Sequence, residues 1–379
     1  MRQIKFLHFA DLHLDSSFAS LGMGHDKAST RRNELKETFG RIINIAKEEA
    51  ADLILISGDL YENGYVRKST ISYINDRFCS IPEIKIVLVP GNHDPYILNS
   101  FYRNYSWSKN VHILSEEKPC IIFEDISTCL YGIGFKSFYQ EQAPLHHVKS
   151  PEGSCFNLLL AHGTVDMNIK QSGYNPMSSE TLSSLGMDYI AMGHFHNRSE
   201  RPEAGIYNPG SPEPLGFDEP GEHGVYLGCI TLSDKGDKQL DVRFIKTSTR
   251  FYETMELDVT GCSNDEQVKS KILHAAHYKD LKAGLFSIIL KGYVECSFKV
   301  STSYIQAALE DRFFHLKIKD ETIPDYNFEE IANESGLRGL FARKVFSLIA
   351  KAEDEQEKKM LMKALYYGIE ALEQGRVEL

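Results

Sequence analysis

The stretch Pro90-Gly91-Asn92-His93-Asp94 decides how this chain is interpreted. It follows residues 84–89, a run rich in β-branched side chains that predicts a fully buried strand ending at a Pro-Gly turn. An amide, an imidazole and a carboxylate therefore come in a row just past a strand, where open α/β sheets place their chemistry. Taken alone, the same residues also fit a polar turn in which Asn92 and Asp94 bond their own backbone.

Two earlier stretches have the same arrangement of a strand followed by ligand-type side chains. Residues 4–9 predict a strand that runs into Asp11 and His13, and residues 53–57 predict another that runs into Asp59. Asp11 and His13 are two positions apart, so in extended chain they point to the same side and can bind one ion. Alone, an Asp-x-His pair is a weak signal that a capped turn explains more simply.

Helices predicted between these strands indicate the fold class. Residues 29–49 carry an apolar stripe that includes Leu35, Phe39 and Ile42, which predicts an amphipathic helix, and a second helix is predicted near residues 68–78. Strand and helix thus alternate along the chain. This alternation predicts an α/β fold in which acids, amides and imidazoles collect at one edge of a parallel sheet.

The second half of the chain repeats this pattern with histidines. Residues 155–160 predict a strand followed by His162, and residues 189–192 predict one followed by His194 and His196. One histidine after one strand is usually structural. Ligand-type residues after five predicted strands are hard to obtain by chance.

The residue types favour a two-metal centre. Carboxylate oxygens and imidazole nitrogens without a thiolate suit borderline divalent ions, and we expect two ions, Mn²⁺ first, with Fe²⁺ and Zn²⁺ as alternatives. Two such ions, about 3.5–4 Å apart, can lower the pKa of a bridging water and clamp a phosphate. The missing thiolate argues against a structural zinc site.

Bulk composition narrows the class of protein. The 379 residues carry a net charge of −11, so a nucleic-acid partner needs a local basic patch or a metal. The seven cysteines show no Cys-x-x-Cys spacing, which is typical of reduced thiols in a cytoplasmic protein. The chain starts directly with a predicted strand and has no apolar run of membrane-spanning length, so we expect no membrane association.

Five short motifs in this order resemble the calcineurin-like metallophosphoesterase superfamily. Any one of them is weak evidence, whereas the ordered set is specific. The motifs are Asp11-Leu12-His13, Gly58-Asp59, Gly91-Asn92-His93-Asp94, His162-Gly163 and Gly193-His194-Phe195-His196.

The resemblance implies a role for each of these residues. Metal one would be held by Asp11, His13, Asp59 and His196, and metal two by Asp59, Asn92, His162 and His194, with Asp59 bridging. His93 would lie over the substrate phosphate and assist the leaving oxygen. Asp94 would orient the His93 imidazole, as carboxylates do for catalytic histidines elsewhere.

A second block is similar to the SbcD-type DNA repair exonucleases, with the YhaO-like branch nearest. This block is Tyr207 to Pro214, which contains Pro-Gly-Ser, followed by Phe217-Asp218-Glu219. The resemblance covers residues 1 to about 250. It implies a four-layer α/β/β/α sandwich and a metal-dependent phosphodiesterase that acts on DNA as an exonuclease or endonuclease.

Glu62 departs from the family pattern. The family has a histidine three residues after the bridging aspartate, where this chain has Glu62. An ionised carboxylate near the substrate cannot donate a hydrogen bond to a phosphate oxygen and repels it. If Glu62 faces the substrate, we expect it to slow the processing of duplex DNA ends. Alternatively, Glu62 turns away and pairs with an arginine or lysine.

The rest of the chain predicts two further parts after a catalytic domain over residues 1–250. Residues 251–325 alternate strand and helix, which predicts a small α+β capping domain that contacts DNA through Lys279, Lys282, Lys291 and Lys299; an ordinary charged surface is the equal alternative. Residues 326–379 predict two helices, over 328–352 and 354–373, whose apolar stripes form a core or bind a partner.

By resemblance, that partner is an SMC-like ATPase, and homodimerisation is a further expectation. Two alternative functions stay open at this point. One is a phosphoesterase for small phosphodiesters or phosphomonoesters, and the other is a weakly active metal-binding scaffold subunit of an ATPase complex.

Overall fold

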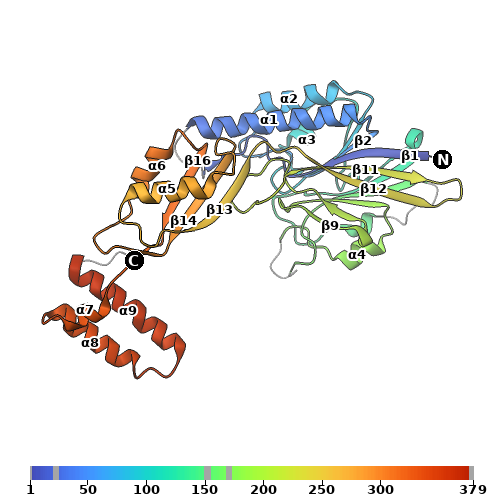
Figure 1. Ribbon diagram of the computed structural model, residues 1–379. Helices are drawn as coiled ribbons and strands as arrows, with labels where there is room; N and C mark the ends of the chain where they lie inside the picture. Colours follow the sequence, from blue (N-terminus) through green and yellow to red (C-terminus); the bar gives the residue numbers. More distant parts are fainter. Residues whose placement is uncertain (1, 20–24, 149–154, 168–172, 375–379) are drawn as a thin grey trace. The chain divides into compact units, whose positions relative to one another are not determined.

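The structure is a computed structural model that describes residues 2–19, 25–148, 155–167 and 173–374. It divides into two compact units (Figure 1). The first comprises Met1–Thr254, Asp280–Phe286 and Phe313–His315, and the second comprises Met255–Lys279, Ser287–Arg312 and Leu316–Leu379. The three-part division expected from the sequence stays a prediction.

Two six-stranded sheets form the centre of the first unit. The first sheet has the order β12 (Lys238–Lys246), β11 (Gly224–Leu232), β1 (Arg2–Phe9), β2 (Leu53–Ser57), β3 (Lys85–Val89), β4 (Val111–Ile113). The second has the order β5 (Cys120–Phe123), β6 (Thr128–Ile133), β7 (Phe156–His162), β8 (Tyr189–Gly193), β10 (Ile206–Asn208), β9 (Ser199–Arg201). Strands β1 to β4 pair in parallel, as do β6, β7, β8 and β10.

Alternating side chains of these strands build a core on each face of the first sheet. In β2, Leu53 and Leu55 pack in the cluster between the two sheets, whereas Ile54 and Ile56 pack in the cluster that contains the helices α1 (His25–Glu48) and α2 (Lys68–Cys79). This two-sided burial explains why the strand is continuously apolar. Figure 1 shows α1 and α2 lying along one face of this sheet.

The outer face of the second sheet is covered in turn. Leu159, Ile190 and Met192 pack there with Leu182 of α4 (Ser179–Ser184). The first unit is therefore a four-layer α/β/β/α sandwich, as predicted. A short helix, α3 (Phe101–Asn104), lies in the connection from β3 to β4.

The second unit contains most of a three-stranded sheet, whose strands begin in the first unit, and the C-terminal helices. The sheet has the order β13 (Phe251–Asp258), β14 (Gly284–Lys291), β16 (His315–Asp320), and β15 (Tyr293–Val294) pairs with β17 (Ile323–Pro324). The helices are α5 (Asp265–Ala276), α6 (Thr302–Leu309), α7 (Phe328–Asn333), α8 (Leu337–Ile349) and α9 (Glu355–Gln374). No helix in the described ranges is both long and apolar enough to traverse a bilayer.

The prediction of a single helix over 328–352 is wrong, because the structure has two helices there. The structure ends α7 at Asn333 and starts α8 at Leu337. Gly336 forms the N-cap of α8. Gly336 and the preceding Ser335 are weak helix formers. Gly339 then approaches the Glu334 carbonyl so closely that a Cβ would lie 2.2 Å from its oxygen. The apolar stripe hides this turn because its hydrophobic spacing continues across it.

Candidate metal centre

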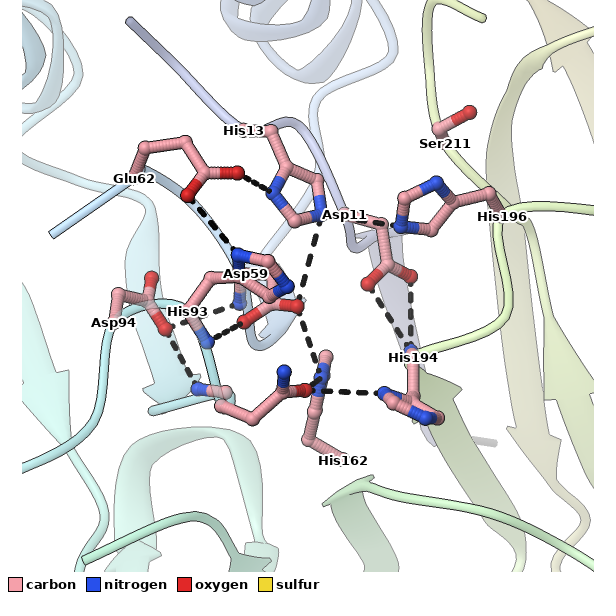
Figure 2. A network of polar contacts seen from close by, with 12 residues as sticks. Asp11, His13, Asp59, Glu62, His93, Asp94, His162, His194, His196 and Ser211 are labelled. Carbon is pink, nitrogen blue, oxygen red and sulfur yellow. Dashed lines mark hydrogen bonds and ion pairs between the residues drawn. The ribbon is translucent and has the colours of Figure 1, made fainter. Parts of the chain in front are cut away.

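The predicted site residues meet at one end of the two sheets, past the C-terminal ends of five strands (Figure 2). Each strand contributes one to three of them, and all of these strands belong to the first unit. The contributions are Asp11 and His13 after β1, Asp59 after β2, Asn92, His93 and Asp94 after β3, His162 at the end of β7, and His194 and His196 after β8.

The backbone that carries these side chains has unusual conformations. Asp11, His13, Asp59 and His194 have positive φ angles of 55°, 48°, 52° and 106°. Such conformations are costly for residues other than glycine and cluster at functional sites. Hydrogen bonds between the loops hold them, for example from the amide of Asp11 to the Gly58 carbonyl and from that of His13 to the Asp59 carbonyl.

Glycine at position 91 allows the loops to come this close. A Cβ on Gly91 would lie 2.1 Å from Oδ1 of Asp59. That oxygen accepts a hydrogen bond from the backbone amide of His93 at 2.8 Å. The loop after β3 therefore fixes the orientation of the Asp59 carboxylate and leaves Oδ2 for other partners.

Asp11, His13 and His196 form the first half of the centre. Nε2 of His13 lies 3.1 Å from Nε2 of His196. The Asp11 carboxylate is fully buried and accepts hydrogen bonds from the His194 amide at 3.0 and 3.1 Å. These three side chains bring one ligand atom each within 4.8 Å of one another.

Asn92, His162 and His194 form the second half, and Asp59 lies between the halves. Oδ1 of Asn92 is 3.1 Å both from Nε2 of His162 and from Nδ1 of His194. Oδ2 of Asp59 is 3.2 Å from Nε2 of His162 and 3.6 Å from Nε2 of His13. Asp59 is thus placed to serve both halves.

The outer partners of the histidines indicate which ring nitrogen is free. Nδ1 of His13 faces Glu62 at 2.7 Å, Nδ1 of His196 faces Glu219 at 2.6 Å, and Nδ1 of His162 faces the Ser57 carbonyl at 2.7 Å. These oxygens only accept, so each Nδ1 carries a proton and each Nε2 of a neutral ring presents a lone pair. The lone pairs point at one another and at the Asn92 and Asp59 oxygens, an arrangement that a cation satisfies.

Electrostatics show that the centre favours positive charge. Burial lowers the pKa of His162, but the Asp59 carboxylate beside it raises this pKa to about 9 overall. Burial likewise lowers the pKa of His196, whereas Glu219 and Asp11 raise it to about 9. The carboxylates of the centre therefore attract positive charge strongly, and the donor set fits two divalent ions.

His93 lies at the rim of the centre with Glu62 as its partner. Its side chain is 45% exposed, and its Nδ1 lies 3.0 Å from the Glu62 carboxylate. Glu62, whose side chain is 16% exposed, spans His13 and His93 with its two oxygens (Figure 2). Burial raises the pKa of Glu62, but its hydrogen bonds to these two imidazoles lower it to about 2. The partner of Glu62 is a histidine pair, so the alternative pairing with arginine or lysine is wrong.

The expectation that Asp94 orients His93 is also corrected. Asp94 is fully buried and accepts hydrogen bonds from the backbone amides of Gly91, Leu60 and Asp59 at 2.7, 2.7 and 3.1 Å. The Tyr102 hydroxyl donates another at 2.6 Å. Asp94 therefore joins the loops after β2 and β3, because their amides point inward there and need an acceptor.

Sequence reasoning missed Glu219 as a site residue. Its second oxygen accepts hydrogen bonds from Ser211 Oγ at 2.7 Å and from the Leu215 amide at 3.0 Å, and Ser211 in turn lies 2.9 Å from Nδ1 of His223. Both Ser211 and Glu219 belong to the Pro-Gly-Ser block. That block marks the family, but nothing in its spacing indicates that it reaches back to a histidine.

Three of the lysines expected to contact DNA belong to a different unit from this centre. Lys279, Lys291 and Lys299 lie in the second unit, and Lys291 forms an ion pair with Glu256 at 2.6 Å. Lys282 lies in the segment Asp280–Phe286, which belongs to the first unit. The DNA-binding role of all four lysines stays a prediction.

Comparison with known proteins places the chain in a family. The model of the calcineurin-like phosphoesterase family matches residues 4–198. The chain is 28% identical over 277 residues to the uncharacterized metallophosphoesterase YhaO of Bacillus subtilis, covering 70% of this chain and 65% of that protein. It is 26% identical over 301 residues to the DNA double-strand break repair protein Mre11 of Methanopyrus kandleri, covering 71% and 62%.

A third relative is matched over nearly its whole length. The chain is 21% identical over 376 residues to one of the subunits of the nuclease SbcCD of Staphylococcus saprophyticus, covering 87% of this chain and 94% of that protein. By contrast, it spans less than two thirds of the first two relatives. The matched residues 4–198 include all nine predicted ligand and catalytic residues from Asp11 to His196. The chain belongs to the calcineurin-like phosphoesterase family.

Proposed function

We propose that this chain is a two-metal phosphodiesterase that hydrolyses DNA, as an exonuclease or endonuclease of DNA repair. The observation that carries the proposal is the position of Asp59 between two sets of nitrogen and oxygen donors. Asp11, His13, Asp59 and His196 would hold one ion, and Asp59, Asn92, His162 and His194 the other. Mn²⁺ is the ion we propose, because mixed imidazole and oxygen donors without thiolate suit it.

When bound, two divalent ions supply an activated water and neutralise the charge of a phosphodiester. The protein's own groups then position the substrate. His93 is exposed at the rim and is held by Glu62, so its other ring nitrogen is available to the leaving oxygen. Proton donation of this kind typically contributes about 10²–10⁴-fold to a rate.

DNA as substrate is supported by the relatives. The names of two of them describe a DNA double-strand break repair protein and a nuclease subunit. We propose the same substrate class here, with residues 251–325 as a capping domain that contacts the DNA. Small phosphodiesters and phosphomonoesters are the alternative substrates.

A partner is proposed for residues 326–379. The helices α8 and α9 bury Ala342, Val345, Leu365 and Ile369 against each other. They leave other large apolar side chains exposed, namely Leu337, Leu340, Leu348, Met360, Tyr367 and Leu372. Apolar side chains on a helical pair suit packing against another helix, and we propose an SMC-like ATPase as the partner.

The proposal is tested with purified protein and Mn²⁺ on a chromogenic phosphodiester and on end-labelled DNA. We expect hydrolysis of both, abolished by a chelator. Hydrolysis of the chromogenic substrate alone would favour the small-substrate alternative. No hydrolysis of either, with two metals bound, would favour the scaffold subunit.

The partner is tested with a chain that lacks residues 328–379. We expect it to retain hydrolysis of the chromogenic substrate and to lose binding to the ATPase. Failure of the truncated chain to fold would place α7–α9 in the protein's core and contradict the partner role.

A further inference from the structure

The proposed ligands of each ion come from both sheets of the first unit. The first sheet supplies the two carboxylates, Asn92 and His13, and the second sheet supplies His162, His194 and His196. Each of the two proposed ions therefore has ligands from both sheets. Since hydrolysis by two metals needs ions about 3.5–4 Å apart, the separation of the sheets at this end has to be fixed.

Two buried polar side chains lie between the sheets next to the centre. On β1, the apolar side chains of Ile4 and Phe6 pack in the core between the sheets, and His8 follows them on the same face. On β2, Leu55 is followed on that face by Ser57. His8 and Ser57 are both fully buried. Buried polar groups cost free energy unless they form hydrogen bonds, so their partners indicate their role.

Strand β8 of the opposite sheet supplies partners for both side chains. Nδ1 of His8 lies 2.9 Å from the Tyr189 hydroxyl, and its Nε2 lies 3.1 Å from the Met192 carbonyl oxygen. The Ser57 hydroxyl donates to the Ala191 carbonyl at 2.8 Å. Since a carbonyl only accepts, Nε2 of His8 carries the proton and Nδ1 accepts from the Tyr189 hydroxyl. Three hydrogen bonds thus join β1 and β2 to the strand that leads to two of the proposed ligands.

The two sheets also approach each other closely at this point. A Cβ on Gly193 would lie 2.1 Å from the Ser57 carbonyl oxygen, and a Cβ on Gly58 would lie 2.3 Å from Nδ1 of His162. The same Ser57 carbonyl accepts a hydrogen bond from Nδ1 of His162 at 2.7 Å. The junction between the sheets therefore contacts a proposed metal ligand directly.

We propose that His8, Ser57 and Tyr189, here named the intersheet cluster, are positioning residues that hold the ligands of the two sheets at the separation that two ions require. The proposal rests on the proposed two-metal function. Apolar packing is non-directional, whereas hydrogen-bond lengths vary by only about 0.5 Å. A buried polar network with all its partners present therefore specifies one arrangement of the sheets more sharply than an apolar contact would.

The test uses the full chain loaded with Mn²⁺, in which two ions that share a carboxylate are magnetically coupled. Electron paramagnetic resonance detects this coupling, which weakens steeply as the ions move apart. Calorimetry measures the affinity of each metal site. The variants are His8→Leu and Ser57→Ala. Ser57→Ala is the milder change, because it removes one hydroxyl and keeps the backbone carbonyl that His162 bonds.

We expect both variants to weaken both metal sites, because each ion has ligands from both sheets. The loss of affinity should be about 10- to 100-fold in His8→Leu. At saturating Mn²⁺ the coupling should be reduced, and kcat for the chromogenic phosphodiester should fall about 100-fold, as for other small displacements of reacting groups. His8→Gln should restore the coupling and most of kcat, since its amide can still donate to the Met192 carbonyl and accept from Tyr189.

Ile4→Ala is the matched control. Ile4 is fully buried on the same strand and the same face as His8, four residues nearer the start of β1. This variant opens a cavity in the same core, so it should lower the midpoint of urea unfolding. Both metal affinities, the coupling and kcat should stay unchanged, because the hydrogen bonds between the sheets are intact.

The remaining outcomes overturn the positioning role. Unchanged coupling and kcat in Ser57→Ala and His8→Leu would remove it and leave the two-metal centre intact; if His8→Leu does not fold, Ser57→Ala alone decides. Weakening of the second site alone would mean that these residues only orient His162. An equal loss of coupling in Ile4→Ala would show a general effect of stability. Two uncoupled Mn²⁺ ions in the unmodified chain, or fewer than two, would contradict the two-metal function itself.

Discussion

The Glu219 carboxylate lies 2.6 Å from Nδ1 of His196 and accepts a hydrogen bond from it. The histidine comes directly after β8, whereas the glutamate lies 23 residues further on, in the loop before β11. Glu219 fixes the ring so that Nε2 faces His13 and Asp11. The Pro-Gly-Ser block therefore contributes to the metal centre, because its Glu219 holds the ring of the proposed ligand His196.

Glu219→Gln should weaken the first metal selectively. Removing such an outer partner typically lowers metal affinity about 10- to 100-fold, whereas His162 of the second metal bonds the Ser57 carbonyl instead. Titration of the metal-free protein with Mn²⁺, followed by calorimetry, should resolve one weakened and one unchanged site. Glu222→Gln is the matched control, since Glu222 is 66% exposed and faces Lys246 at 3.9 Å. Two unchanged sites in Glu219→Gln would remove Glu219 from the centre.

Asp59→Asn should be the most damaging single substitution at the centre. Asp59 faces both halves, and an amide cannot supply the negative charge that two cations share. We expect loss of at least one metal equivalent by elemental analysis and loss of hydrolysis. Full occupancy by two metals in this variant would contradict the bridging assignment.

His93→Ala and Glu62→Gln should separate two kinds of effect. The His93 side chain bonds Glu62 rather than a proposed ligand, so His93→Ala should keep both metals and lose about 10²–10⁴-fold in kcat. Glu62 bonds both His93 and His13, so Glu62→Gln should lower kcat and also weaken the first metal. Metal loss in His93→Ala, or unchanged metal affinity in Glu62→Gln, would show that these roles are misassigned.

Substitution of Asp94 should act on stability. Asp94→Ala leaves several buried amides and the Tyr102 hydroxyl without an acceptor, which should cost about 3 kcal/mol or more of unfolding free energy. Tyr102→Phe removes one donor and should cost about 1–2 kcal/mol. Urea unfolding at pH 7 measures both. If Asp94→Ala lowers only kcat and leaves stability unchanged, Asp94 has a catalytic role after all.

His8 should make the protein less stable in acid. Burial lowers the pKa of His8 to about 3, so the folded state keeps this ring neutral while the unfolded chain takes up a proton below about pH 6.5. The unfolded state thus binds more protons between pH 3 and 6.5, and stability falls as the pH falls through this range.

The expected loss from His8 between pH 7 and pH 5 is about 2 kcal/mol. His8→Gln, which can still bond Tyr189 and the Met192 carbonyl, should show a correspondingly smaller loss in urea unfolding over the same range. Parallel pH profiles for the two proteins would mean that His8 is protonated in the folded state.

Much of this fold is predictable from the sequence because the elements that carry the site are local and strongly patterned. β2, β3, β7 and β8 are mostly apolar, β1 carries four apolar residues from Ile4 to Phe9, and each strand ends in or is soon followed by its ligand-type residues. The short strands β4, β9 and β10 have three residues each and depend on pairing with distant neighbours. A pattern of that length carries no usable period, so the sequence does not predict these strands.

The hydrogen-bond partners of the carboxylates around the centre are harder to predict from the sequence, also because they depend on distant parts of the chain. Asp94 is next to His93 in sequence, yet its side chain bonds the loop after β2, 34 residues earlier. Glu62 and Glu219 reach their histidines across 49 and 23 residues. Sequence adjacency is a poor guide to side-chain partners where several strand ends meet, because the topology decides which loops come together.

The pairing of β1 affects how the protein is synthesised. β1 lies between β2 and β11, and Arg2 to His8 pair in register with Leu232 to Tyr226. One edge of the first strand therefore stays open on the ribosome until residue 232 has been added, about 10–45 s later at common elongation rates. During that interval an apolar strand edge is available to other chains. The nascent protein should accordingly depend on chaperones until β11 has emerged, and truncated products that end before it should aggregate.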